Sequence, residues 1–205
     1  MSYTTMLLFI PTFFLVSITP GMCMLLALTL GMSIGVRRAM YMMCGELLGV
    51  AIVASAAALG VATLMLELPE AFVFLKLAGG TYLAWLGYQM WCSRGRLVLT
   101  EDKNPPAQAG LQLALNGFIT AIANPKGWAF FITLLPSFVV AEHPLAPQLT
   151  AMIAIVMVLE FTAMMIYASG GKALRHLLMN KNNVKLLNRI SGTLMIAVGA
   201  WLAFS

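Results

Sequence analysis

The first 36 residues, Met1 to Val36, contain no charged side chain. Four later stretches of more than 20 residues carry one charged residue each, and only 9% of the chain is charged while 61% is hydrophobic. Soluble domains have about 25% charged residues, whereas a helix that crosses a membrane needs about 20 mostly apolar residues. The sequence therefore predicts an all-α integral membrane protein and excludes a water-soluble globule.

Charged residues and proline clusters divide the chain into predicted spans. The connections between these spans are too short for a soluble domain, so we expect residues 1–205 to form a single transmembrane domain. Its first half is about 1–104 and its second half about 105–205. The six predicted transmembrane helices lie near residues 7–34, 40–66, 71–92, 111–140, 147–170 and 188–204.

The basic residues report orientation. The chain has twelve Lys and Arg against seven Asp and Glu, and ten of the basic residues fall in three of the five connections. Loops rich in Lys and Arg stay in the cytoplasm, so we expect both termini on the outer side of the membrane. A scattered basic excess of this kind predicts no nucleic-acid partner. The ten residues are Arg37, Arg38, Arg94, Arg96, Lys103, Lys172, Arg175, Lys181, Lys185 and Arg189.

The two halves of the chain share two sequence patterns at corresponding spans. A Pro-Gly break follows a polar residue in the first span of each half, at 19–21 and at 124–127. The third span has Gly80 and Gly87, and the sixth has Gly192 and Gly199, with the same seven-residue spacing. Three spans in each half would insert the second half upside down. We therefore predict a 3+3 inverted-topology repeat, the architecture of many secondary transporters.

The two breaks are candidate binding elements. Proline removes a backbone hydrogen bond inside a helix, so Thr19-Pro20-Gly21 and Asn124-Pro125-Lys126 predict helices that stop and restart within the membrane. A restarted helix exposes N–H groups and the positive end of its dipole, which suit a carboxylate. We expect Thr19 and Asn124 to cap the new N-termini. The alternative is that the prolines are kinks that only shape packing.

Three ionisable residues lie inside predicted spans. Lys126 is about fifteen residues from each end of its span, too deep to reach water easily. Glu160 is also near the middle of its span, and we expect it to pair with Lys126. Glu46 is a second acidic candidate. Charged groups at this depth are expensive and are functional-site hypotheses by default; the alternative is a purely structural ion pair.

Other classes of site find little support. The three cysteines, Cys23, Cys44 and Cys92, have no CxxC spacing, and the two histidines lie in connections. We therefore expect no metal site, no cofactor, no disulfide framework and no enzyme. The GxxxG spacings at 31–35 and 45–49 let helices approach closely, and they fit either internal packing or the face of a homodimer.

The whole chain resembles the amino-acid exporter family named for its lysine and homoserine/threonine exporters (LysE/RhtB). Thr19-Pro20-Gly21-Met22 is similar to the family's Thr-Pro-Gly-Pro, with Met22 where the family has proline, and Asn124-Pro125-Lys126 is similar to its Asn-Pro-Lys. The glycine-rich stretch with Gly31, Gly35, Gly45 and Gly49 and the segment 76–83 are also similar to the family.

This resemblance implies export of amino acids or close derivatives across the bacterial cytoplasmic (inner) membrane by proton antiport. We expect neutral substrates, such as homoserine and threonine, ahead of basic ones. Together with the residues above, it predicts a substrate site at the broken helices and proton coupling by Glu160 or Glu46. The alternative is a channel, or a membrane scaffold subunit that does not transport. The predicted substrate-binding residues are Thr19, Pro20, Gly21, Asn124, Pro125 and Lys126.

Overall fold

The structure, a computed structural model, describes residues 3–93, 109–140 and 143–204. In this part of the chain the regular structure is helical and contains no strand. Each of the six predicted spans is helical, which confirms the all-α class. The helices are α1 (Tyr3–Ile18), α2 (Met22–Ser33), α3 (Val36–Glu67), α4 (Pro69–Cys92), α5 (Gly110–Ile122), α6 (Pro125–Leu134), the 3₁₀ turn η1 (Pro136–Phe138), α7 (Leu145–Met179) and α8 (Lys181–Phe204).

Two of the predicted spans are broken helices. The chain bends by 60° between α1 and α2 and by 53° between α5 and the segment that begins with α6. Pro20 lies in the first gap, and Pro125 is the first residue of α6, where a missing N–H costs no helical hydrogen bond. The predicted restart of both helices is therefore confirmed.

Four segments of the described chain are long and apolar enough to cross a membrane, if each bent pair counts as one span. They are α3, α7 and the two bent pairs. In α7 the apolar part ends at Gly171, which adopts φ 45° and kinks the helix, next to the boundary that the sequence predicted. Helix α8 begins with a polar segment. The count of six crossings stays a prediction.

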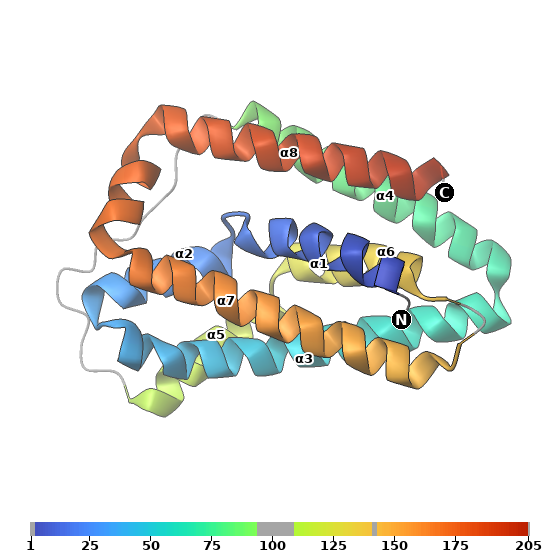
Figure 1. Ribbon diagram of the computed structural model, residues 1–205, viewed down its shortest axis with the longest axis horizontal. Helices are drawn as coiled ribbons and strands as arrows, with labels where there is room; N and C mark the ends of the chain where they lie inside the picture. Colours follow the sequence, from blue (N-terminus) through green and yellow to red (C-terminus); the bar gives the residue numbers. More distant parts are fainter. Residues whose placement is uncertain (1–2, 94–108, 141–142, 205) are drawn as a thin grey trace.

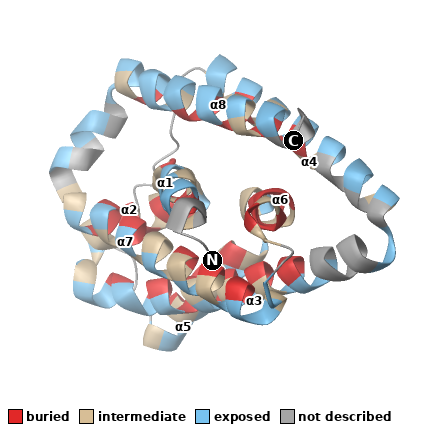
Figure 2. Ribbon diagram, turned by 45° about the vertical axis from the view of Figure 1, so that its right-hand side comes forward, coloured by how far each residue is buried: buried red, intermediate tan, exposed pale blue. Residues whose placement is uncertain are grey.

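The helices are arranged around a central pair (Figure 1). Helices α4 and α8 lie side by side and antiparallel, and α2, α3, α5 and α7 form the opposite side of the molecule. Helices α1 and α6 lie between these two groups, with buried residues facing inward (Figure 2). Helix α1 begins and α8 ends toward one end of the molecule, and the α2–α3 and α7–α8 connections lie at the other end (Figure 1).

The packing is paired in a way that the repeat predicts. Helix α2 packs against α7 as α6 packs against α3, helix α1 packs against α7 as α5 packs against α3, and α4 packs against α8. Exchanging the two halves of the chain maps each of these contacts onto another contact or onto itself. This pattern supports the inverted repeat, which remains a prediction. Arg94, Arg96 and Lys103, which belong to the predicted cytoplasmic connections, lie outside the described residues.

The repeated glycines bring α4 and α8 together. A Cβ added at Gly87 would lie 2.5 Å from the carbonyl oxygen of Gly192, and one at Gly199 would lie 2.5 Å from that of Gly80. No side chain fits at such distances, so the seven-residue spacing in the sequence is a packing device that lets two backbones touch.

Substituting one of these glycines is expected to destabilise the protein. Gly87→Ala should lower the free energy of unfolding by about 2 kcal/mol, because the added methyl group overpacks the α4–α8 contact. Gly60→Ala is the matched control, since a Cβ at Gly60 meets nothing within 4 Å. Thermal unfolding in detergent measures both variants. Equal midpoints would contradict the close contact.

The GxxxG glycines mostly pack inside the molecule. Gly31 contacts α7, and Gly45 and Gly49 contact α5, each at a distance that excludes a side chain. Gly35 instead adopts φ 85° in the turn between α2 and α3, a conformation that favours glycine. Internal packing, the first of the two interpretations, is confirmed for Gly31, Gly45 and Gly49.

Candidate functional site

A cavity lies between the two breaks, near the middle of the molecule. The centres of water-sized groups can occupy about 40 Å³ of it, which is room for about three waters. Of the predicted site residues, all but the two prolines line this cavity, and the prolines lie in the breaks beside it. The lining residues are Phe13, Val16, Ser17, Thr19, Gly21, Cys23, Met24, Glu46, Val50, Val53, Ala121, Asn124, Lys126, Gly127, Phe130, Phe131 and Glu160.

Two apolar clusters enclose this polar layer. On one side are phenylalanines of α1, α6 and η1, of which Phe9 contacts Phe13 and Phe138 with ring centroids 4.4 and 5.2 Å apart. On the other side are mainly small and sulfur-containing side chains of α2, α3 and α7, such as Met24 and Met164. The polar groups of the cavity are therefore shielded from water along the length of the bundle.

Lys126 bridges the two breaks. Its Nζ donates hydrogen bonds to the carbonyl oxygens of Val16, at 2.8 Å, and Thr19, at 3.2 Å. It also lies 5.9 Å from the centre of the Phe130 ring. These carbonyls sit where α1 stops, so the α-helical donors four residues further on are missing, and only Val16 O keeps a backbone donor, the Thr19 N–H at 3.3 Å. The lysine satisfies them and brings a cation to the end of α1.

The predicted pair of Lys126 and Glu160 stays a prediction, since the hydrogen bonds that each side chain makes in the described residues go to other partners. Glu160 Oε1 accepts a hydrogen bond from the Ser17 hydroxyl at 2.9 Å, while Lys126 is engaged by the carbonyls of α1. Both residues nevertheless line the same cavity. The carbonyls freed by the break compete with the carboxylate for the ammonium group, and sequence alone does not show that competition.

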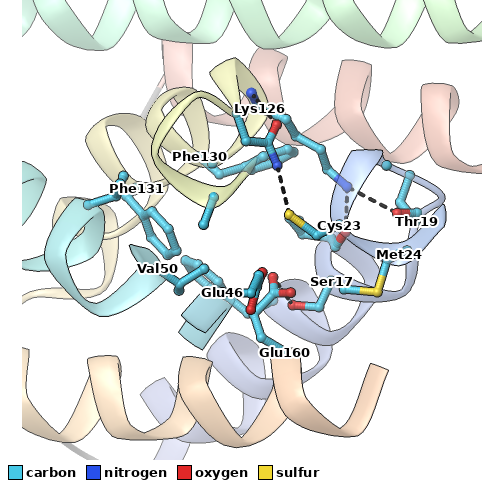
Figure 3. Close-up of a pocket in the computed structure, with 17 residues that line it drawn as sticks. Ser17, Thr19, Cys23, Met24, Glu46, Val50, Lys126, Phe130, Phe131 and Glu160 are labelled. Atoms are coloured by element: carbon cyan, nitrogen blue, oxygen red, sulfur yellow. Dashed lines mark hydrogen bonds between the residues drawn. The ribbon is translucent and has the colours of Figure 1, made fainter. Parts of the chain in front are cut away.

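The two glutamates lie close together on the side of the cavity opposite Lys126 (Figure 3). Glu160 comes from α7 and Glu46 from α3, and Glu46 is 1% exposed. Within the described part of the chain, Glu46 Oε2 is buried without a hydrogen-bond partner. A buried carboxylate oxygen of this kind is costly, so it is available to a ligand or a proton.

Asn124 caps α6 as predicted, but Thr19 does not cap α2. The side chain of Asn124 accepts a hydrogen bond from Lys126 N at 3.2 Å, and its amide donates toward Cys23 Sγ at 3.8 Å. Residue Gly21 occupies the N-cap position of α2, without a side-chain cap. The Thr19 hydroxyl turns back to the carbonyl of Leu15, at 2.6 Å, because Thr19 directly follows the last turn of α1.

Aromatic donors satisfy the last carbonyl of each interrupted helix. The hydroxyl of Tyr167, on α7, donates to Ile18 O at 2.9 Å. The indole Nε1 of Trp128, on α6, donates to Ile122 O at 2.9 Å. Irregular backbone survives at membrane depth only when protein groups satisfy it, and these side chains fulfil that condition.

Removing one of these donors is expected to weaken the fold. Tyr167→Phe leaves Ile18 O without its hydroxyl partner in a buried position, which costs about 1–3 kcal/mol. The midpoint of thermal unfolding should fall. Tyr41→Phe is the control, since Tyr41 is 56% exposed on α3. An unchanged midpoint for Tyr167→Phe would mean that the hydrogen bond contributes nothing to stability.

Sequence analysis missed three residues of the site. Ser17 has a signal, because it lies in the last turn of α1, just before the predicted break. Cys23 lies one residue into α2 and faces the cavity (Figure 3), but the cysteine spacing bears only on metal sites and disulfides and gives no sign of this position. Tyr167 has no local signal, since only the packing of α7 against α1 brings its hydroxyl to the break.

Interrupted helices around a buried, charged cavity in an all-α membrane protein are the architecture of many secondary transporters. The comparison with known families gives the same class. Residues 14–205 match the family described as LysE type translocator. The chain belongs to this family, whose members are transporters and not enzymes.

Relatives of the chain include proteins named as efflux proteins. A homoserine/homoserine lactone efflux protein of Salmonella typhimurium is 28% identical over 92% of this chain and 91% of its own length. A leucine efflux protein of an Enterobacter species is 26% identical over 93% of this chain and 90% of its own. An uncharacterized membrane protein of Vibrio cholerae is 25% identical, with 91% and 90% covered. No solved structure matches the chain.

Proposed function

We propose that the protein exports neutral amino acids or close derivatives from the cytoplasm, and that the cavity between the two breaks is its substrate site. The observation that carries this proposal is the charge arrangement of the cavity. One cation, Lys126, lies across from two carboxylates, Glu46 and Glu160. An α-amino acid carries one carboxylate and one ammonium group, so it matches both sides.

The substrate carboxylate is placed at Lys126. The N-termini of α2 and α6 begin beside the lysine, so the helix dipoles favour an anion at the same place. The ammonium group is placed at Glu160 and at the unpartnered oxygen of Glu46. Charge-assisted hydrogen bonds of this kind are roughly twice as strong as neutral ones, which selects for the amino-acid head group over other solutes.

Coupling to protons follows from the same carboxylates. A glutamate that binds the substrate ammonium group cannot bind a proton at the same oxygens. Substrate and proton therefore occupy Glu160 and Glu46 in alternation, which is the logic of an antiporter. Proton entry would then drive amino-acid exit.

The membrane orientation is part of the proposal. Arg37 and Arg38 begin α3 at the end of the molecule opposite to the start of α1 and the end of α8 (Figure 1). Basic residues near span ends remain in the cytoplasm. We therefore place both termini on the outer side of the bacterial inner membrane. The efflux proteins among the relatives support outward transport of amino acids.

Efflux from proteoliposomes tests the function. Vesicles that contain the purified protein are loaded with labelled leucine, homoserine, threonine or lysine, and release is followed with the proton gradient intact and collapsed. We expect saturable release of neutral amino acids that depends on the gradient. Linear, gradient-independent flux would mean a channel, and no release of any amino acid from inserted, folded protein would mean a scaffold.

A further inference from the structure

A second cavity lies on the other side of α1. It is lined by α1, α6 and α8. The centres of water-sized groups can occupy about 130 Å³ of it, which is room for roughly ten waters by the measure used for the first cavity. Of the predicted site residues, Thr19 alone is among those that line this second cavity. The lining residues are Thr12, Leu15, Val16, Thr19, Phe130, Ser191, Leu194, Met195 and Val198.

The two cavities share a wall. Val16, Thr19 and Phe130 line both. This wall is the seam between α1 and α6, which the Lys126 ammonium group crosses to reach the carbonyls of Val16 and Thr19. The cation that we assign to the substrate carboxylate therefore lies at the junction of the two spaces.

The charged groups line the first cavity, whereas the second cavity has the larger volume. The first holds the charged groups but only about 40 Å³, which is too small for a head group and a side chain of four atoms together. The second has about 130 Å³, and its described lining contains no charged residue. Its polar atoms are hydroxyls, and those of Thr19 and Ser191 lie 3.2 Å apart.

We propose that this second cavity receives the side chain of the transported amino acid, so that α8 selects neutral aliphatic or hydroxylated side chains. The inference rests on the proposed function and deepens it. A substrate carboxylate that takes over Lys126 releases the hydrogen bonds across the seam. Rotation of the Phe130 ring then opens the wall toward Met195 and Ser191. A charged side chain would lose its solvation there without a partner.

The size of the cavity is tested with Met195→Phe. Met195 is 5% exposed, and it lines the second cavity but not the first. A phenylalanine ring at this position reduces the space for the side chain of the substrate. Leucine and alanine share one head group and differ in side-chain volume. We expect the ratio of leucine to alanine efflux to fall about tenfold, in line with the value of one or two methylene groups. Ile190→Phe, at an exposed position of α8, should leave this ratio unchanged.

The hydroxyl of Ser191 is tested with substrates of nearly equal shape. Homoserine and norvaline differ by a hydroxyl in place of a methyl group. Ser191→Ala should lower the homoserine to norvaline efflux ratio about fivefold, the value of one hydrogen bond. Thr193→Ala is the control, since the Thr193 hydroxyl bonds to Arg189 O and lies outside the cavity lining.

The outcomes separate this inference from the function itself. If the wild-type protein releases no amino acid, the proposed function fails. If the wild type transports, but Met195→Phe and Ser191→Ala leave both ratios unchanged or lower all substrates equally, the second cavity does not hold the side chain. The same unchanged ratios are expected if a lipid acyl chain fills it. Changed ratios in folded variants support the inference.

Discussion

Replacing Lys126 with alanine is expected to reduce amino-acid efflux by at least about 100-fold. In the proposed site, Lys126 pairs with the carboxylate of the substrate. Truncating one partner of a buried, hydrogen-bonded charge pair costs about 2–5 kcal/mol. Here the loss removes the cation for the substrate carboxylate and also the Lys126 hydrogen bonds to the carbonyls of Val16 and Thr19. Initial rates of efflux from proteoliposomes, at equal amounts of inserted protein, measure the effect.

Two controls separate the charge from the fold. Lys185→Ala removes a lysine from an exposed position of α8 and should leave efflux unchanged. Lys126→Arg keeps the cation and its donors, and should retain part of the activity with a lower substrate affinity. Wild-type efflux by Lys126→Ala would show that the lysine is only a structural partner of the break.

Replacing Glu160 with glutamine is expected to uncouple transport from the proton gradient. The amide oxygen can still accept the hydrogen bond from Ser17, so the packing of α7 against α1 should persist. An amide neither takes up a proton nor carries the charge that the ammonium group requires. Gradient-driven efflux should therefore fall to the rate measured with the gradient collapsed, a loss of at least about tenfold in rate.

The matched control is Glu70→Gln, at an exposed position in the first turn of α4, which should keep wild-type coupling.

Glu46→Gln is expected to weaken substrate affinity as well as coupling, because the unpartnered oxygen of Glu46 faces the proposed ammonium site. Efflux by Glu160→Gln at the wild-type rate, with the same pH dependence, would contradict its role in coupling.

The parts of the structure that depend on local chemistry were predictable. Long uncharged stretches mark spans, because lipid excludes charges wherever they fall in the fold. Proline followed by glycine marks a break, because the missing hydrogen bond is a property of the residue itself. Asn124 was recognisable as a cap for the same reason, since it directly precedes the proline that starts α6.

The partners within the site were not predictable. Thr19 was expected to cap α2, but the cap depends on which residue leaves the helical conformation, and that residue is Gly21. The hydrogen bonds of Lys126 to α1 were not expected, because they depend on how the two broken helices lie against each other. Tyr167 and Ser191 come to the breaks through contacts between distant segments, which no local pattern encodes.

The two breaks differ in what holds them. The carbonyl at the end of α5 accepts a hydrogen bond from Trp128, six residues further along the same span. This break is therefore stabilised by a residue of its own span. The carbonyls at the end of α1 are bound by Lys126 and Tyr167, from two helices of the other half. The geometry of the second break is therefore fixed within its own span, whereas that of the first depends on how the two halves pack, so a change in that packing would loosen the first break before the second.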